Sequence, residues 1–455
     1  MNRFVAIGAV AAALPACSVG VEQAEGGVAV LPYMHESVAL RELDGSGAGK
    51  ISHIVFIIQE NRSFDNLFQG YPGADTVSSG KNSLGQMIKL KPYSLKGPKY
   101  DIGHDAQAMF AACDGSRTLP GTDCKMDGFN LESGPPIGPQ NPQAYVYVPH
   151  RESAPYFDMA REWVVADKNF ASQLDESFVA HQYAIAAQAA WSVNLPTIEW
   201  GCGGGKTNAV ATITKKRSID GPPIRPCYDY QTLGDELDRA NLSWRFYAAA
   251  FGGGGSATGS NWSAYRAVRH IRYGPDWRKI VSPSWHFIAD VRAGKLANFT
   301  WITPLCSDSD HVNCGGGYGP SWVATLVNTV GRSKFWSSTA IFVIWDDWGG
   351  MYDHVPPPYL GRDGLGFRTP LLVISPYAKK DYVSHVQYET ASVLRFAEDL
   401  FGLERLSDAD KRATSPATDC FDFSKPPRPF ERIDAPLGAP FFMKQRPEYQ
   451  IPDYE

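Results

Sequence analysis

IFVIWDDWGGMYDHVPPP, residues 341–358, joins a hydrophobic run to two adjacent carboxylates. Residues 339–345 carry no charge and are rich in β-branched and aromatic side chains, which predicts a strand buried on both faces, as in a parallel sheet. Asp346 and Asp347 follow without a spacer, and the next two glycines permit a sharp turn and a close backbone approach. Ligands of open α/β sheets bind beyond the carboxyl ends of the strands, and adjacent carboxylates repel unless a cation or proton separates them. The pattern favours a cation site, although a polar turn after a core strand also fits it.

A second stretch has the same organisation. ISHIVFIIQ at residues 51–59 predicts another buried strand, and it runs directly into ENRSFD. If both strands belong to one parallel sheet, Glu60 and Asn61 lie at the same edge as Asp346 and Asp347. Four oxygen-bearing side chains at one edge suit a hard divalent cation.

Ser177 precedes an alanine-rich run. FVAHQYAIAAQAA, which starts at residue 178, contains no glycine or proline and predicts a helix with Ser177 at its N-cap. A hydroxyl at this position lies in the positive field of the helix start, beside N–H groups that can bind phosphate oxygens. The alternative is a serine that only caps the helix, which is the common use of serine there.

The length and composition suit an exported α/β enzyme. The chain has 455 residues, 44% of them hydrophobic, which is sufficient for one large domain with long loop insertions. The net charge of -5 and the lack of a basic stripe exclude nucleic acid as the expected partner.

The first 16 residues predict a signal peptide. Arg3 is followed by an apolar run at 4–14 that is too short to span a bilayer, and Leu-Pro-Ala-Cys at 14–17 is similar to a bacterial lipobox. Cleavage there leaves Cys17 as a lipidated N-terminus, so we expect membrane attachment through this lipid and a location in the cell envelope. Pro15 is unusual in a lipobox, which leaves plain secretion open.

Export favours disulfides. Three pairs are close in sequence and each closes a loop that contains glycine or proline, which predicts Cys113 with Cys124, Cys202 with Cys227, and Cys306 with Cys314. Cys420 is left over. Metal ligation is the competing interpretation, but no pair has the Cys-x-x-Cys spacing of a zinc knuckle.

The rest of the chain predicts further elements of an α/β core. Residues 70–128 are expected to form a long loop excursion. We expect a leader at 17–50, a catalytic domain at 51–406 and a Pro-rich extension at 407–455. Strands are predicted at 163–167, 242–248, 299–304 and 368–375, and helices at 320–330 and 388–401, the last ended by Gly402.

Together these segments resemble the bacterial phosphoesterase family that includes phosphatidylcholine-type phospholipases C and related acid phosphatases. The matching motifs are at 60–65, 125–129, 345–358 and 368–378, within residues 51–402. The resemblance implies an alkaline-phosphatase-like fold, which is a three-layer α/β sandwich with a mostly parallel central sheet.

The family's chemistry implies one divalent metal ion (Ca²⁺, Mg²⁺, Mn²⁺ or Zn²⁺), with Ser177 as nucleophile and as a metal ligand. Phospholipase C members have a threonine in a Pro-rich context here, so the serine leaves the substrate class open between a phospholipid and a soluble phosphate ester. The implied metal ligands are Glu60, Asn61, Ser177, Asp346 and Asp347.

Three histidines resemble the family's active-site histidines. His104, His270 and His311 are expected to bind phosphate oxygens or to protonate the leaving oxygen, although His270, among three arginines, also fits a surface residue. The expected function is metal-dependent hydrolysis of phosphoric esters through a phosphoseryl intermediate. The alternative is a non-catalytic surface lipoprotein that binds a cation or a polysaccharide.

Overall fold

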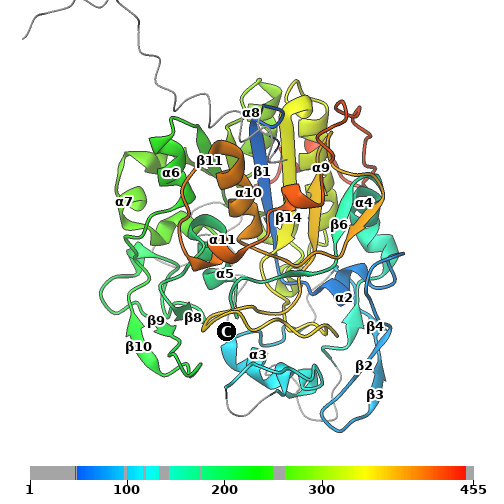
Figure 1. Cartoon of the computed structure of the whole chain (residues 1–455), viewed down its shortest axis with the longest axis vertical. Coiled ribbons are helices and arrows are strands. Elements are labelled where there is room, and N and C mark those ends of the chain that lie inside the picture. Colours follow the sequence, from blue (N-terminus) through cyan, green and yellow to red (C-terminus); the bar gives the residue numbers. More distant parts are fainter. Residues whose placement is uncertain are drawn as a thin grey trace, which may run out of the picture. The chain divides into compact units, whose positions relative to one another are not determined.

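The strand expected at residues 339–345 is β14 (Thr339–Trp345), and it lies inside an eight-stranded sheet (Figure 1). All of its residues are buried. β1 (His53–Gln59) runs parallel beside it, in a register that pairs Gln59 with Trp345. The structure is a computed structural model that describes residues 47, 49–96, 100–115, 119–132, 143–174, 176–249 and 262–446.

The sheet has the order β12-β11-β13-β1-β14-β15-β6-β16. Each strand predicted from the sequence overlaps one of its members. Only β15 is antiparallel to its neighbours. No helix lies between β14 and β15, so the chain returns without the crossover that a parallel pair requires. The other strands are β12 (Ile280–Val281), β11 (Trp244–Tyr247), β13 (Phe299–Ile302), β15 (Leu371–Ile374), β6 (Val164–Ala166) and β16 (Tyr382–Ser384).

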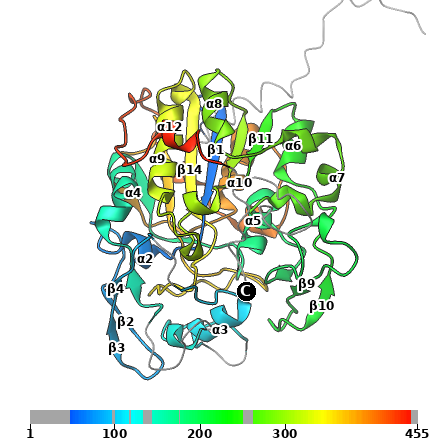
Figure 2. The ribbon, with the colours of Figure 1, turned by 180° about the vertical axis from the view of Figure 1, so that it is seen from behind.

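Helices cover both faces of the sheet (Figures 1 and 2). One face carries α4 (His150–Glu162), α8 (His286–Arg292) and α9 (Gly319–Gly331), which pack against one another. The other carries α5 (Ser177–Ala186) and α10 (Ser392–Phe401). The expected α/β class, with its layers and mostly parallel sheet, is therefore confirmed.

Some expected boundaries were wrong. The helix expected at 388–401 begins at Ser392, because Tyr388–Glu389 form β17, which pairs with β7 (Asn169–Phe170). Gly402 ends α10 as predicted, with a left-handed φ of 67°.

Residues 70–128 contain more regular structure than the expected loop. A hairpin forms from β2 (Ser79–Lys81) and β3 (Met87–Lys89), and β4 (Lys91–Pro92) pairs with β5 (Val146–Tyr147). Helix α3 (Ala106–Cys113) starts where Asp105 accepts a hydrogen bond from the Ala108 N–H at 2.7 Å. The remaining elements are α2 (Phe64–Phe68), β8 (Ser192–Val193), β9 (Val210–Thr212), β10 (Gly221–Ile224), α6 (Leu233–Arg239), α7 (Arg269–Arg272), α11 (Asp408–Arg412) and α12 (Ala439–Phe442), with 3-10 turns at Phe129–Leu131, Cys202–Gly204, Ala264–Ala267, Pro275–Lys279, Cys306–Asp308, Val312–Cys314, Trp336–Ser338 and Pro416–Thr418.

The three predicted disulfides are present, as Cys113–Cys124, Cys202–Cys227 and Cys306–Cys314. Cys420 is free and buried. The predicted signal peptide, Cys17 and almost all of the leader lie outside the described residues. Within the described residues, no helix combines the length and apolarity that a membrane span requires.

The segment from residue 407 onward is not wholly extended, because it contains α11 and α12. Phe430 in this segment stacks on Trp163 with ring centroids 5.9 Å apart, and it meets Trp336 edge-on at 5.0 Å. Aromatic contacts therefore bind this part of the chain to the body of the domain.

Candidate active site

The two expected acidic motifs meet at the carboxyl ends of β1 and β14. Because Gln59 and Trp345 are paired, the residues that follow them are neighbours, and the Asn61 N–H donates to Asp346 Oδ1 at 2.8 Å. Gly349 has a left-handed φ of 61°, and a Cβ there would lie 2.5 Å from the Asn61 carbonyl oxygen. Glycine is therefore required for the turn after Asp347 to approach the first motif this closely.

Helix α5 brings Ser177 and His181 to the same place. Ser177 Oγ donates to Asp347 Oδ2 at 3.4 Å, and His181 Nε2 lies 3.1 Å from Glu60 Oε1 and 3.9 Å from Asp346 Oδ2. Ser177 is the first residue of α5 and Glu176 is the N-cap, so the predicted capping position was wrong by one residue. Its hydroxyl points to the carboxylate and makes no capping bond.

His104 orients the Asn61 amide. His104 Nδ1 donates to the Ile102 carbonyl oxygen at 2.8 Å, and in the neutral ring Nε2 then accepts from Asn61 Nδ2 at 2.7 Å. This tautomer fixes the amide flip and leaves Asn61 Oδ1 directed elsewhere. Within the described residues, Asn61 Oδ1 has no hydrogen-bond donor.

His311 lies next to His104, with ring centroids 6.3 Å apart. It is carried by the loop that the Cys306–Cys314 disulfide closes. The preceding residue, Asp310, accepts hydrogen bonds from Trp345 Nε1 at 2.9 Å and Tyr156 Oη at 2.7 Å, and its own N–H donates to Gln59 Oε1 at 3.1 Å.

Asp310 therefore ties the histidine loop to the last residues of β1 and β14. Burial raises the pKa of Asp310, and it outweighs the opposing effects of the Arg62 charge and of the Tyr156 and Trp345 hydrogen bonds. Arg62 Nη2 donates to the Asp310 carbonyl oxygen, which holds the same loop from the other side.

His270 is not brought to this cluster. It lies on α7 with its side chain 40% exposed, and Nε2 is 2.8 Å from Asp235 Oδ1. The structure therefore leaves His270 in a surface hydrogen bond with Asp235. The expected residues that it places together are Glu60, Asn61, His104, Ser177, His311, Asp346 and Asp347.

Sequence reasoning missed His181. Its signal was the spacing from Ser177, because residues four apart lie on the same side of a helix. If the FVAHQY run is a helix and Ser177 at its start is the nucleophile, His181 is directed at the same edge of the sheet.

The cluster fits a divalent cation by its chemistry. Glu60, Ser177 and Asp346 are at most 1% exposed, and ligand atoms of Glu60, His181 and Asp346 lie within 4.8 Å of one another. Asp346 Oδ2 is a buried acceptor without a hydrogen-bond donor, and no lysine or arginine of the described residues pairs with Asp346. Buried acceptors of this kind are costly unless a cation or proton satisfies them.

Comparison with known proteins gives consistent relatives. The sequence profile of the Phosphoesterase family matches residues 51–404. Non-specific phospholipase C3 of Arabidopsis thaliana is 25% identical, over 83% of this chain and 76% of that protein. Phospholipase C B of Mycobacterium tuberculosis is 24% identical, over 83% of this chain and 79% of that protein.

Solved structures give weaker similarity. A protein of the alkaline phosphatase superfamily from Vibrio parahaemolyticus covers 86% of this chain and 79% of its own, with 10% identity and a TM-score of 0.37. Because the family profile spans most of the chain, including both strand-end motifs and α5, this protein belongs to the Phosphoesterase family and is a phosphoric ester hydrolase.

Proposed function

We propose that this chain cleaves phospholipids in the manner of a phospholipase C, with a bound divalent cation and through a covalent phosphoseryl intermediate on Ser177. The observation that carries the proposal is the position of Ser177 Oγ, which is hydrogen-bonded to Asp347 at 3.4 Å and lies at the start of α5. The names of the relatives support a phospholipid substrate.

The residues that would hold the cation are Glu60, Asn61, Asp346 and Asp347, with His181 and Ser177 beside them. When bound, a divalent cation supplies charge that polarises the phosphoryl group and favours the ionised form of a neighbouring hydroxyl. Its identity is left to experiment, since oxygen-rich sites accept Ca²⁺, Mg²⁺, Mn²⁺ or Zn²⁺ under different geometries.

The chain's own residues then carry out two displacements at phosphorus. Asp347 accepts the hydrogen bond of the Ser177 hydroxyl, which directs a lone pair of Oγ outward for attack. As the new Oγ–P bond forms, the Ser177 proton passes to Asp347, the bond from phosphorus to the diacylglycerol oxygen breaks, and that oxygen takes a proton from His311. Water then attacks phosphorus and gives a proton to His311, while the Oγ–P bond breaks and Ser177 Oγ recovers its proton from Asp347, which releases the phosphorylated headgroup.

The histidines have separate roles in this proposal. His104 positions Asn61, since its Nε2 accepts from the Asn61 amide and so turns Oδ1 away from the ring. His311 lies beside His104 and is the candidate donor of the leaving-group proton. His270 has no role.

Export is part of the same proposal. Three disulfides favour an oxidising compartment, where a phospholipase meets its substrate outside the cytosol. The lipid on Cys17 stays a prediction. The alternative of a non-catalytic binding protein is not favoured for a member of a hydrolase family.

The test is Ser177→Ala, assayed with p-nitrophenyl phosphorylcholine and with phosphatidylcholine vesicles. We expect kcat to fall by roughly 10³-fold or more, because the variant lacks the nucleophile. The thermal unfolding midpoint should be unchanged. Ser177→Thr is the matched control and should retain measurable activity, since the family's phospholipases use threonine. Acid-quenched wild-type enzyme should carry a phosphoryl adduct on the peptide that contains residue 177. Full activity of the alanine variant would overturn the nucleophile assignment.

A further inference from the structure

Exposed hydrophobic side chains gather at the active-site end of the sheet. They belong to the β2–β3 hairpin, to the segment around β8 and β9, and to the loop after β14, which Figures 1 and 2 place beyond the carboxyl ends of β1 and β14. In the part of the chain that the structure describes, these side chains are 44% to 60% exposed, and they are Leu84, Met87, Trp191, Ile198, Tyr359 and Leu360.

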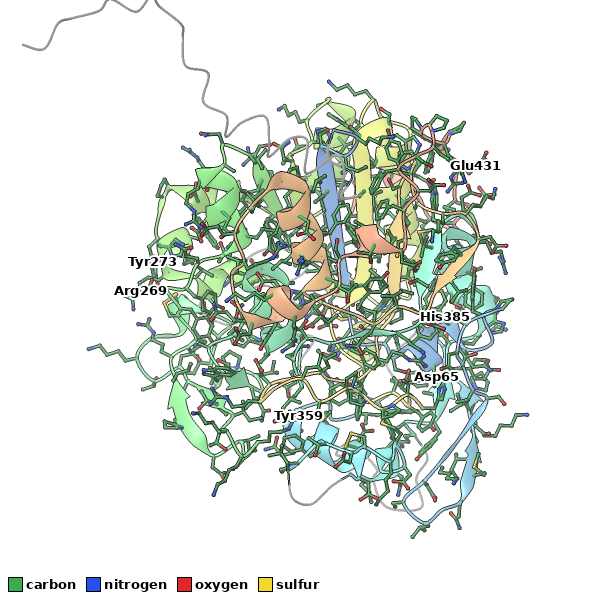
Figure 3. All side chains as sticks on the ribbon, in the orientation of Figure 1. Asp65, Arg269, Tyr273, Tyr359, His385 and Glu431 are labelled. Carbon is green, nitrogen blue, oxygen red and sulfur yellow. A yellow bond between two sulfur atoms is a disulfide. The ribbon has the colours of Figure 1, made fainter. Side chains whose placement is uncertain are left out.

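Three of these side chains form one patch with an arginine. We define the Trp191 patch as Trp191, Tyr359, Leu360 and Arg362. The Arg362 guanidinium carbon is 3.4 Å from the centroid of the Trp191 ring, and Leu360 and Arg362 line the same 310 Å³ cavity as Trp191. Figure 3 labels Tyr359, on the loop after β14, in the lower half of the view.

The patch is held rigidly from below. Arg217 is buried under Tyr359, with its guanidinium carbon 5.3 Å from the ring centroid. Its Nη1 donates to the carbonyl oxygens of Gly361 at 3.1 Å and Arg362 at 3.0 Å, which anchors the backbone of the loop. Burial lowers the pKa of Arg217 to about 10, which still leaves it a cation at neutral pH.

Trp191 adopts an uncommon backbone conformation, with φ of 65°. A left-handed φ costs energy for a large side chain, and glycine or asparagine is the usual choice. The chain nevertheless places a tryptophan there and leaves it 44% exposed. Arg362 covers one side of the indole, and the rest of the ring faces solvent.

The charge around the patch is mainly positive. Lys215 and Lys216 are exposed and directly precede Arg217. Asp363 is turned inward, where it accepts a hydrogen bond from Tyr183 Oη and faces Arg412. The exposed acid on the cavity rim is Asp408, which pairs with Lys411 at 3.9 Å.

The loop that carries the patch continues to the active site. A Cβ at Gly366 would lie 2.1 Å from the Gln173 carbonyl oxygen, so the loop packs directly on the segment before α5. Gln173 Nε2 in turn donates to the Asp346 carbonyl oxygen at 3.2 Å. Whatever the patch binds is therefore held close to the segment that positions Ser177.

We propose that the Trp191 patch inserts into the headgroup region of a phospholipid bilayer and holds the active-site end of the sheet against it. Tryptophan and tyrosine rings beside arginine and lysine have the composition that suits the boundary between headgroups and acyl chains. This inference rests on the proposed phospholipid hydrolysis.

The test compares two double variants. Trp191→Ser with Leu360→Ser alters the patch, and Tyr273→Ser with Phe441→Ser is the matched control. Tyr273 is 65% exposed and directly follows α7, and Phe441 is 36% exposed and lies on α12, so both are outside the patch. Partitioning is measured by sedimentation with phosphatidylcholine vesicles that contain phosphatidylglycerol. We expect partitioning of the patch variant to be at least about tenfold weaker than that of wild type, and partitioning of the control variant to be unchanged.

Activity separates the patch from the chemistry. Hydrolysis of soluble p-nitrophenyl phosphorylcholine should be unchanged in the patch variant, whereas hydrolysis of vesicle lipid should fall with partitioning. If wild-type protein hydrolyses neither substrate but the partitioning difference is observed, the proposed function is wrong and the inference that the Trp191 patch binds a bilayer is supported. Equal partitioning of wild type and patch variant, or an equal loss in the control, overturns the inference.

A charge variant guards against misfolding of the patch variant. Lys215→Gln with Lys216→Gln changes only exposed side chains. It should weaken partitioning to the anionic vesicles by several-fold and reduce its salt dependence, because each lysine near an anionic surface contributes to binding. Unchanged salt dependence counts against a bilayer as the partner.

Discussion

Two groups of acidic and histidine side chains lie beyond the ends of β1 and β14, and both have ligand atoms close enough to hold a metal ion. One consists of Glu60, His181 and Asp346, and the other of Asp65, Asp353 and His354. Their carboxylates come from the same two sequence motifs, and His181 is contributed by α5. The difference between them lies in what the fold places at the centre of each group.

The second group already contains a cation. Arg368 is buried, and its Nε donates to both oxygens of Asp353 at 3.0 and 3.1 Å, while Nη2 lies 3.5 Å from Asp65 Oδ1. Asp65 Oδ2 also accepts from His354 Nδ1 at 2.6 Å. The charges of Asp353 and Asp65 outweigh burial and raise the pKa of Arg368. This group is a closed ion-pair network that joins the first motif to the third.

In the first group, no lysine or arginine of the described residues pairs with Asp346. Among the same residues, Asp346 Oδ2 and the neighbouring Asn61 Oδ1 are buried acceptors without donors. An acidic residue after a strand is therefore not by itself a metal ligand. The buried oxygen that the fold leaves unsatisfied is the better indicator, and the following predictions test this distinction.

Asp346→Asn should have the largest effect. It removes a carboxylate from the group without an internal cation. The activation free energy should therefore rise by about 4 kcal/mol, and kcat/KM should fall roughly 10³-fold. Kinetic assays with p-nitrophenyl phosphorylcholine check this, and circular dichroism should show a folded protein. Near-normal activity would mean that Asp346 holds no cation.

Asp353→Asn should instead reduce stability. Removing one partner of a buried ion pair costs about 3–5 kcal/mol in the free energy of unfolding, because Arg368 is left partly uncompensated. Urea denaturation measures the loss, and the activity of each folded molecule should stay near that of wild type. A stable Asp353→Asn protein without activity would reverse the assignment of the two groups.

Removal of divalent cations should separate the groups by stability as well. At a free concentration 100 times Kd, a bound cation adds about 2.7 kcal/mol to the free energy of unfolding. Thermal unfolding with and without EDTA should show this difference in wild type and in Asp353→Asn, but not in Asp346→Asn. An EDTA effect that survives in Asp346→Asn would place the cation elsewhere.

The smallest effect concerns pH. Burial lowers the pKa of His354, but the hydrogen bond and charge of Asp65 outweigh it and leave the pKa raised. The protonated ring therefore stabilises the fold fully below the unfolded pKa of about 6.5, and this contribution disappears as pH rises through the folded pKa. His354→Asn should lower the unfolding midpoint at pH 6 by an amount worth about 1 kcal/mol or less, and the difference from wild type should shrink above pH 8. A difference that grows with pH would contradict the raised pKa.

The parts of the site that follow directly after strands were predictable from sequence. β14 and β1 are uncharged runs with a clear end, so their sequences predict that Glu60, Asn61, Asp346 and Asp347 lie at one edge. The disulfides followed from loop closure alone, because each pair is close in sequence.

The remaining parts depend on contacts that no local pattern encodes. His270 resembles a site residue in sequence, but α7 directs it to Asp235 at the surface. Arg368 lies near a strand start with no sign that its charge belongs to Asp353 and Asp65. Predicting a role for His181 requires two steps. The helix that starts at Ser177 must place residue 181 on the same side as Ser177, and Ser177 must itself be the nucleophile, which is a hypothesis.

The pairing of β1 with β14 also sets the order in which the site can be completed. The hydrogen bond from Asn61 to Asp346 joins residues 285 positions apart, and Ser177 and His181 enter from a third segment. Contacts this distant in sequence form late, after the entropy of closing the intervening chain has been overcome. A cation that binds only the finished edge is expected to slow unfolding and to leave the folding rate unchanged. The same ion that serves catalysis would thus give the enzyme a longer lifetime against proteases.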